Sequence, residues 1–237
     1  RSSIGGQYNN FYNWNYTRLQ YENSENNSAF SYGEGSGWNL GWTFTNTASY
    51  KKVIDKHNVE LLVGQEALNF GTGRNMSASG LNPFSTDVNF VNMSTVAAAG
   101  KVVNSGLSKG VNFYSVFGRV NYIFNDKYIV TAVLRRDGSS RFGTNSRYGV
   151  FPAFSAAWRI SSEPFMKSLA WVSDLKIRGG YGTMGNSNPV DANNQYSLFG
   201  TNIGRSGYDI NGSNSGIVEG YYRTRIGNPD ARWETAV

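Results

Sequence analysis

The chain has 237 residues, of which 15% are aromatic and 16% charged, with a formal net charge of +6 and no cysteine. This length accommodates one large β domain or two small ones. The lack of cysteine excludes disulfides and thiolate metal sites, and the scattered Lys and Arg argue against a nucleic-acid-binding surface. No apolar run approaches about eighteen residues, so insertion into a membrane would require β-strands rather than a helix.

In the first half of the chain, apolar and polar residues alternate in some segments, while others have no period. Trp38, Leu40 and Trp42 alternate with polar or small residues, which is typical of a strand. In chain order we predict a strand end over residues 1–7, a long loop over 8–37, a strand over 38–50, a short connection over 51–58, a strand over 59–70 and a long loop over 71–110.

The second half repeats this organisation, with a tight turn at Asn125-Asp126. We predict strands over residues 111–124, 127–136, 147–160 and 174–185, a loop over 137–146, a short helix within 162–173, the longest loop over 186–231 and the start of a strand at 232. Pro152 lacks a main-chain donor, so we predict either a bulge there or an irregular pairing near the outer end of the strand. The chain also looks incomplete, because it starts without Met and ends where a strand pattern has only begun.

The strands around the Asn125-Asp126 turn have one apolar face and one mixed, partly charged face. The residues predicted to face lipid are Tyr122, Tyr128, Val130, Ala132, Leu134, Phe154, Trp158, Leu175 and Ile177. The residues predicted to face a wet lumen are Arg119, Arg135, Asp137, Arg147, Arg159, Lys176 and Arg178. Pairing of these charges with one another is favoured over a role in guiding substrate.

Two architectures produce such faces: a membrane barrel, and a soluble sheet with one face on a core. The predicted strands are long, and the connections alternate between long and short. Outer-membrane barrels have short turns at one end and long loops at the other, whereas soluble sandwiches need not differ between their two ends. The sequence therefore favours an all-β, antiparallel transmembrane barrel segment. A soluble cell-surface β-sandwich that binds carbohydrate is the alternative.

Three strings resemble the barrel of the SusC/RagA family of TonB-dependent outer-membrane transporters. They are GRVNYIFNDKYIVTAVLRRDGSSRFG over residues 118–143, GVFPAFSAAWRISSEPFM from Gly149 and DLKIRGGYGTMGN from Asp174. The resemblance implies that residues 1–237 form part of a 22-stranded barrel in the outer membrane of a Bacteroidota bacterium, with long extracellular loops and a short helix in a periplasmic turn. Neither a plug domain nor a TonB box is recognisable in the chain.

The resemblance also implies a function and partners. The whole protein would import glycans or peptides, coupled to TonB through a part absent from this chain and acting with a SusD-like surface lipoprotein. Aromatic residues of the predicted loops are candidates to stack on sugar rings: Tyr12, Trp14, Tyr16, Tyr196, Tyr208, Tyr221 and Tyr222. Packing of these rings against the loops or the partner is an equally good interpretation.

Catalytic and metal sites are not predicted. His57 is the single histidine and lies in a predicted polar turn, so no Ser/His/Asp set can be assembled. The Gly180–Gly185 segment matches GxGxxG, but Pro189 and polar residues follow where a nucleotide site needs a helix. The Asp209–Ser213 segment resembles the start of a calcium loop but lacks its glycine and glutamate. We therefore expect a non-enzymatic protein without a cofactor.

Overall fold

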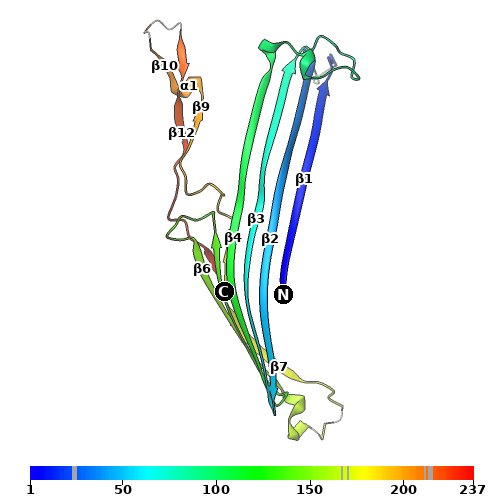
Figure 1. Ribbon diagram of the computed structural model, residues 1–237, viewed down its shortest axis with the longest axis vertical. Helices are drawn as coiled ribbons and strands as arrows, with labels where there is room; N and C mark the ends of the chain where they lie inside the picture. The colour runs from blue at the N-terminus through cyan, green and yellow to red at the C-terminus, as the bar shows by residue number, and fades with distance from the viewer. Residues whose placement is uncertain (23–25, 167, 170, 211, 213–215) are drawn as a thin grey trace. The chain divides into compact units, whose positions relative to one another are not determined.

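A computed structural model describes residues 1–22, 26–166, 168–169, 171–210, 212 and 216–237. Its main element is a seven-stranded sheet in which β1 to β7 follow one another in chain order (Figure 1). The strands are β1 (Ser2–Thr17), β2 (Ser31–Ile54), β3 (His57–Leu81), β4 (Val102–Phe124), β5 (Tyr128–Ser139), β6 (Tyr148–Arg159) and β7 (Lys176–Gly182). Neighbouring strands that are also consecutive in the sequence make an up-and-down meander, as the all-β prediction requires.

The remaining elements are short. Three further strand pairs are β8 (Met184–Asn186) with β13 (Glu234–Ala236), β9 (Leu198–Thr201) with β12 (Tyr221–Arg225), and β10 (Gly207–Asp209) with β11 (Ile217–Glu219). The helical elements are η1 (Met93–Thr95), η2 (Ala98–Gly100), η3 (Ile160–Ser162), η4 (Pro164–Met166) and α1 (Ile203–Ser206). No helix in the described part of the chain is long and apolar enough to cross a membrane.

The chain divides into two compact units. The first unit comprises residues 1–3, 44–67 and 112–237, and the second comprises residues 4–43 and 68–111. In the first unit, β5 pairs with β4 on one side and with β6 on the other, and β6 pairs with β7. The register is continuous through Leu134 and Pro152, so the predicted bulge at Pro152 is wrong. The Pro152 carbonyl accepts hydrogen bonds from Thr183, which follows β7.

The tight turns of the first unit lie at the predicted places. Asn125 and Asp126 have φ angles of 50° and 56°, a left-handed conformation that Asn and Asp tolerate better than most residues. Asp55, in the turn between β2 and β3, has a φ of 50°. The Asn125 N–H donates to the Lys56 carbonyl at 2.7 Å, so these two turns are adjacent. The connection predicted over residues 51–58 shortens to residues 55–56 because both flanking strands extend into it.

Two predicted loops are instead half strand or more. Residues 8–37 contain the greater part of β1 and the start of β2, and residues 71–110 contain the end of β3 and the start of β4. In β1 the alternation is present but is carried by Asn and aromatic residues, which sequence reasoning assigned to turns. In β3 and β4, Gly71 and Gly110 have φ angles of 78° and 68°. Such residues are typical of bulges, which shift the phase of the alternation and hide it.

Two other predicted connections contain short elements. Residues 162–173 hold the end of η3 and all of η4, which are single 3₁₀ turns rather than one continuous helix in the described residues. The segment 186–231, predicted as the longest loop, contains α1 and two small hairpins. These hairpins escape a period-based prediction because their strands are three to five residues long.

The sheet has exposed apolar side chains and little core. Tyr128, Val130, Leu134, Phe154 and Trp158 are between 37% and 56% exposed. Among the described residues, the buried hydrophobic side chains are Tyr32, Val91, Val96, Val111, Phe142 and Phe151. A sandwich of this length would bury the inner faces of two stacked sheets. The apolar face of this sheet is not covered by a second sheet within the described chain, which contradicts the sandwich alternative.

Candidate functional site

The apolar face of the first unit is continuous across four strands. Cα partners share a face, and the register pairs Val130 with Tyr122 and Ala156, and Trp158 with Tyr128 and Ile177. The predicted lipid-facing residues that lie in strands are therefore on one face: Tyr122, Tyr128, Val130, Ala132, Leu134, Phe154, Trp158 and Ile177. Leu175 precedes β7 and lies outside the strand. Contact of this face with lipid stays a prediction.

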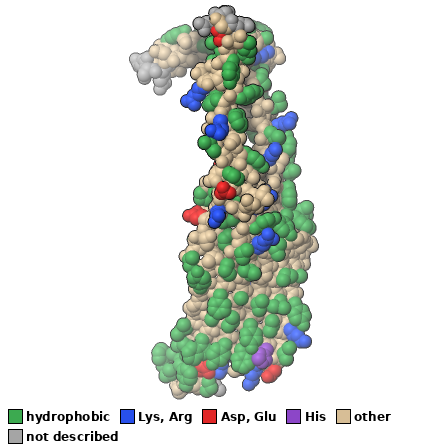
Figure 2. Space-filling view, turned by 90° about the vertical axis from the view of Figure 1, so that its left-hand side faces the viewer, with side chains coloured by type: hydrophobic (Ala, Val, Ile, Leu, Met, Phe, Trp, Pro, Cys, Tyr) green, Lys and Arg blue, Asp and Glu red, His purple; other side chains and the backbone are tan. Residues whose placement is uncertain are grey.

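A row of rings lies at the end of this face that carries the tight turns. It consists of His57, Tyr122, Phe124, Tyr128 and Trp158, and we name it the aromatic row. The His57 Nδ1 atom and the Tyr122 hydroxyl are 2.8 Å apart, and the His57 and Phe124 ring centroids are 5.0 Å apart. The Phe124 and Tyr128 rings stack at 6.3 Å. Figure 2 shows hydrophobic side chains gathered around the histidine. The single histidine thus belongs to an aromatic cluster.

Glu163 anchors the connection between β6 and β7 to the aromatic row. Its carboxylate accepts hydrogen bonds from Lys127 Nζ at 2.8 Å, Tyr128 Oη at 2.9 Å and Trp158 Nε1 at 3.1 Å. The residue is 8% exposed. These bonds, led by the one from Lys127, lower the pKa of Glu163 to about 2. Sequence reasoning missed this contact, since it assigned Glu163 only to the start of a helix.

The opposite face of the first unit carries paired charges. Arg119 Nη2 lies 2.9 Å from Glu60 Oε1, and Arg135 Nη2 lies 3.5 Å from Glu66 Oε1. Arg135 Nε also lies 2.6 Å from Asp137 Oδ1. All of these side chains are partly exposed, so each pair contributes about 0–1 kcal/mol to stability. This pairing agrees with a structural role for the charges.

The other predicted lumen-facing residues divide into two groups. Lys176 pairs in register with Arg159, and Arg178 pairs with Ala157, which places these cations on the same face of β6 and β7. Arg147 immediately precedes β6, and its carbonyl accepts a hydrogen bond from Trp233 Nε1 at 3.1 Å. Arg147 is therefore a loop anchor rather than a member of the strand face.

A partly buried aromatic cluster joins the end of the segment 187–233 to the strands. Phe142 is fully buried, and its ring centroid is 5.0 Å from that of Trp233. The Trp233 ring also contacts Phe151 at 5.5 Å and Phe113 at 6.5 Å in edge-on geometry. We name these four residues the Trp233 cluster. No periodic signal marks it, because its members come from four separate segments.

Polar contacts reinforce this attachment. The Arg141 guanidinium donates to the carbonyls of Asn188 and Val190. Arg225 Nη1 lies 3.2 Å from Asp191 Oδ1. The Asn193 N–H donates to Asp191 at 2.7 Å, and this bond, followed by the one from Arg225, lowers the pKa of Asp191. Within its described residues, the segment 187–233 is thus tied to Arg141 near the sheet and to itself through Arg225 and Asp191.

The predicted substrate-binding aromatics do not form one site. In the first unit, Tyr196, Tyr208 and Tyr221 are 58%, 59% and 74% exposed, while Tyr222 is partly covered and lies under the Arg205 guanidinium at 5.5 Å. Tyr208 lies in β10, and Tyr221 and Tyr222 lie in β12. Their role in binding stays a prediction.

Tyr12, Trp14 and Tyr16, in the second unit, lie in strand β1, so their predicted loop position is wrong. They alternate along β1 on the same face as Tyr8, which stacks on Trp38 at 6.5 Å. Tyr16 stacks on Phe30 at 6.2 Å, and its hydroxyl donates to the Thr86 carbonyl at 2.8 Å. These rings are therefore part of an aromatic strand face.

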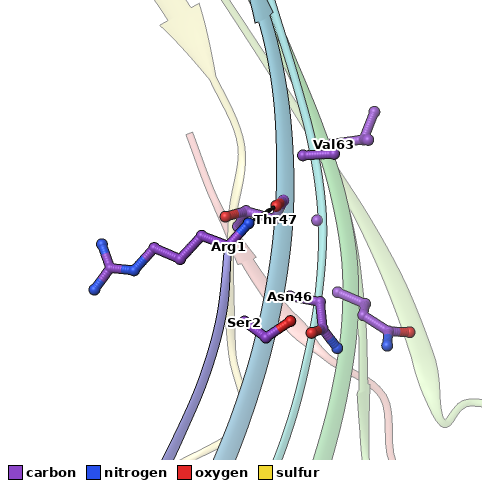
Figure 3. A pocket seen from close by; sticks show the side chains of 8 residues that line it. Arg1, Ser2, Asn46, Thr47 and Val63 are labelled. Carbon is purple, nitrogen blue, oxygen red and sulfur yellow. Dashed lines mark hydrogen bonds between the residues drawn. The ribbon is translucent and has the colours of Figure 1, made fainter.

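A hollow of about 350 Å³ in the first unit lies where β1 begins (Figure 3). The Arg1 amino group donates to the Thr47 carbonyl at 2.8 Å, and the Thr47 N–H donates to the Arg1 carbonyl at 2.9 Å. The other residues that line the hollow are Ser2, Asn46, Ala48, Val63, Gly64 and Gln65. None of these lining side chains is an acid, a histidine or a cysteine, the usual general bases.

The structure places one of the two sequence motifs and only part of the other. Gly180 and Gly182 lie in β7, and Gly185 lies in β8, which is followed by a turn at Ser187 instead of a helix. Asn211 and Ser213 of the calcium-like segment lie outside the described residues. Within the described part of the chain, no group of three or more His, Cys, Asp or Glu side chains could hold a metal ion.

Comparison with known proteins identifies relatives along most of the chain, although no family model matches it. TonB-dependent receptor P26 of Formosa agariphila is 34% identical over 198 residues, which is 82% of this chain and 19% of the receptor. TonB-dependent receptor SusC of Bacteroides thetaiotaomicron is 27% identical over 222 residues, which is 84% of this chain and 20% of SusC. The chain thus spans about a fifth of the length of these curated relatives.

Solved structures give the same result. A structure of the RagAB peptide importer in a closed-closed state matches with a TM-score of 0.82 and 26% identity, covering 99% of this chain and 24% of that chain. A second structure, of the RagAB importer in an open-open state, matches with a TM-score of 0.81 at the same identity. Each relative is named as a receptor or an importer. The strand meander and these relatives together show that the chain is a barrel segment belonging to the SusC/RagA family of TonB-dependent receptors.

Proposed function

We propose that residues 1–237 form part of the wall of a bacterial outer-membrane importer of glycans or peptides. In this proposal the apolar face of the first unit contacts lipid, and the ion-paired face borders the solute path. The observation that carries it is the separation of chemistry on the same strands: Val130 and Leu134 are exposed on one face, while Arg119 and Arg135 pair with carboxylates on the other.

Strand length supports this role. A tilted strand crosses the hydrocarbon layer with about nine to eleven residues. Strands β5 and β6 each have 12 residues, which is enough for one crossing. Strands β2, β3 and β4 have 24, 25 and 23 residues, about twice that requirement. We infer that a large part of β2–β4 stands outside the bilayer.

The aromatic row fits the boundary of the membrane. Tyr and Trp are enriched where apolar rings meet lipid and polar groups meet water. The Tyr128 hydroxyl and the Trp158 indole N–H both donate to Glu163, so their polar ends point to the connection and not into the apolar face. This end, with its tight turns, corresponds to the periplasmic side of an outer-membrane barrel.

The relatives supply the rest of the proposal. We infer that the whole receptor contains a plug and a TonB-contacting segment elsewhere, acts with a SusD-like lipoprotein and has no enzymatic activity. RagAB is named as a peptide importer, which makes peptides one of two candidate substrate classes for this receptor. The segment 187–233, which the Trp233 cluster joins to the strands, is a candidate surface for the lipoprotein or the solute.

Site-directed labelling tests which face meets lipid. This chain has no cysteine, so Val130→Cys and Val133→Cys introduce unique labels here, one on each face of β5. In the full-length receptor, in vesicles containing brominated lipids, we expect a fluorophore at position 130 to be quenched and one at 133 to be unaffected. Equal quenching at both positions would contradict the proposed wall.

Uptake tests the importer role directly. Radiolabelled oligosaccharides or peptides should enter cells that carry the full-length receptor, and uptake should stop when TonB is deleted. A receptor that supports no TonB-dependent uptake of either class would disprove the function while leaving the wall geometry intact.

A further inference from the structure

The second unit has a repeated contact between asparagine and glycine on adjacent strands. A Cβ atom on Gly35 would lie 2.5 Å from the Asn13 Oδ1 atom, and one on Gly33 would lie 2.5 Å from the Asn15 Oδ1 atom. Gly106 has the same relation to the Asn75 carboxamide. Each carboxamide therefore lies over a glycine of the neighbouring strand. The carboxamides and glycines together form a polar floor.

Two hollows lie on this floor. One of about 270 Å³ is lined by Phe11, Asn13, Asn15, Asn75, Ser77 and Ser79 together with the glycines at 33 and 35. The other, of about 310 Å³, shares Phe11 and Asn75 and adds Asn39, Gly106 and Ser108. Asn13, Asn15 and Asn75 are exposed. These volumes lie just above and just below the lower limit of small-molecule sites, which is about 300 Å³.

The floor is almost free of charge. Glu34 borders the first hollow, but its carboxylate accepts a hydrogen bond from the Met93 N–H at 3.3 Å. Arg74 borders the second hollow, which no carboxylate lines. A carboxamide has both donors and an acceptor, so it can satisfy a hydroxyl in either role. Phe11, 51% exposed, offers a ring face beside the carboxamides. Such a surface suits a neutral, hydroxyl-rich solute better than an ionic one.

We propose that this asparagine floor, defined by Phe11, Asn13, Asn15, Asn39 and Asn75, is a binding surface for a neutral oligosaccharide. The proposal rests on the proposed function, because it takes the imported solute to reach this wall. Extended peptides commonly bind by adding a strand at a sheet edge. The floor lies on the face of the strands instead, so its side-chain amides rather than a main-chain edge would contact the ligand.

Paired variants of the full-length receptor test the carboxamides. Asn13→Leu with Asn75→Leu removes two amides while keeping the branching of the side chain, and Asn10→Leu, also exposed on β1 but on the opposite face, is the control. Calorimetry would use a panel of neutral hexasaccharides from glucans, xylans and mannans, an acidic oligogalacturonate and an uncharged hexapeptide. We expect a neutral oligosaccharide to bind about tenfold or more weakly to the double variant, as two lost hydrogen bonds predict, with Asn10→Leu unchanged.

A second pair displaces an amide without removing it. A Cβ on Gly35 must push the Asn13 carboxamide away, whereas a Cβ on Gly5 meets no atom within 4 Å. Gly35→Ala should therefore weaken oligosaccharide binding, and Gly5→Ala should not. Heat-modifiable migration on gels establishes that every variant forms a folded barrel.

The outcomes separate this proposal from the importer function. Wild-type affinity in the folded Asn13→Leu/Asn75→Leu variant overturns the floor. The floor is also overturned if the receptor takes up only the peptide or the acidic sugar, or if it binds no neutral sugar of the panel. In either case the importer function stands as long as uptake depends on TonB. Loss of TonB-dependent uptake for every solute class defeats the importer function itself.

Discussion

The first and second units are built from long antiparallel strands, but different side-chain chemistry fills their faces. The first unit places ion pairs such as Arg119 with Glu60 on one face, and the Glu163 carboxylate gathers a lysine, a tyrosine and a tryptophan at one end. The second unit carries neutral carboxamides that lie over glycines, as Asn13 does over Gly35.

This difference suggests different roles: the contacts of the first unit stabilise the fold of the wall, and the carboxamides of the second unit provide a binding surface. Charged and buried aromatic contacts are directional and hold one arrangement, and the free energy of unfolding falls when one partner is removed. Carboxamides over glycine add little burial and leave donors and acceptors open to a solute. We therefore expect substitutions in the first unit to change mainly stability, and those on the asparagine floor to change mainly binding.

The largest expected effect is at Phe142, the fully buried member of the Trp233 cluster. Phe142→Ala leaves a cavity beside Trp233, and such truncations cost about 3–5 kcal/mol. Because the ring attaches the segment 187–233, the cost should appear as opening of that segment. Hydrogen–deuterium exchange of the full-length receptor should show faster exchange there, with protection of β5 and β6 retained.

Phe199→Ala is the matched control, since Phe199 belongs to the same segment but is 65% exposed. It should leave exchange nearly unchanged. Equal exchange rates of the segment 187–233 in Phe142→Ala and Phe199→Ala would mean that the Trp233 cluster does not hold this segment. The first unit would then lack the aromatic anchor that distinguishes it from the second unit.

The next effect separates the two faces of β5. Val130→Arg places a charge on the apolar face, and near the middle of a bilayer this costs about 2–4 kcal/mol of folding free energy. Val133→Arg places the same charge on the opposite face, where its Cα partner on β4 is Arg119, and should cost less. Urea unfolding of the full-length receptor in lipid vesicles measures both. Equal costs would show that lipid does not contact the apolar face.

The sequence predicts the strands of the first unit well, because there the apolar face follows a strict period of two. The alternation of Tyr128, Val130, Ala132 and Leu134 sets the register with β4 and β6, and the Asn125-Asp126 turn fixes its start. Resemblance to the SusC/RagA family rests on the same stretch and is confirmed by the relatives.

The second unit could not be predicted in this way, for two physical reasons. Gly71 and Gly110 adopt positive φ angles, and a bulge in a strand shifts which residues share a face. In β1, three of the four asparagines (Asn9, Asn13 and Asn15) lie on one face, and propensity rules treat asparagine as a turn residue. The contacts of Glu163 and Trp233 join segments far apart in the sequence, so periodicity carries no signal for them.

A smaller effect concerns the low-pH loss of the stabilisation that the Glu163 carboxylate contributes through its hydrogen bonds. Its pKa of about 2 lies below the value of about 4.3 for an unfolded glutamate, so protons bind the unfolded chain more readily. The stabilisation is therefore complete above about pH 4.3 and is lost as the pH falls towards 2. Glu163→Gln removes the titration. We expect the difference in unfolding free energy between wild type and variant to be constant from pH 8 to 5 and to shrink below that range.

Subtracting the variant cancels the titration of the other carboxylates, provided that they behave alike in both proteins. Asp191→Asn is a useful second variant, because the pKa of Asp191 is also lowered but the residue lies in a different connection. Asp191→Asn should leave the pH dependence of Trp158 fluorescence unchanged, because Trp158 donates to Glu163 and not to Asp191. A wild-type-to-Glu163→Gln difference that is as large at pH 2.5 as at pH 7 would contradict the anchor.

The smallest expected effect tests the contrast between charged and neutral faces directly. A double-mutant cycle with Glu60→Gln and Arg119→Met should give a coupling energy of about 0–1 kcal/mol, because both side chains are partly exposed. Salt should reduce this coupling, since exposed charges are screened within about 8 Å at physiological ionic strength. Asn13→Leu in the second unit removes no charge, so its effect on unfolding should not depend on salt. A coupling well above 1 kcal/mol that resists salt would show that the charged face is shielded from water, and it would then be a packed interior surface instead of the border of a solute path.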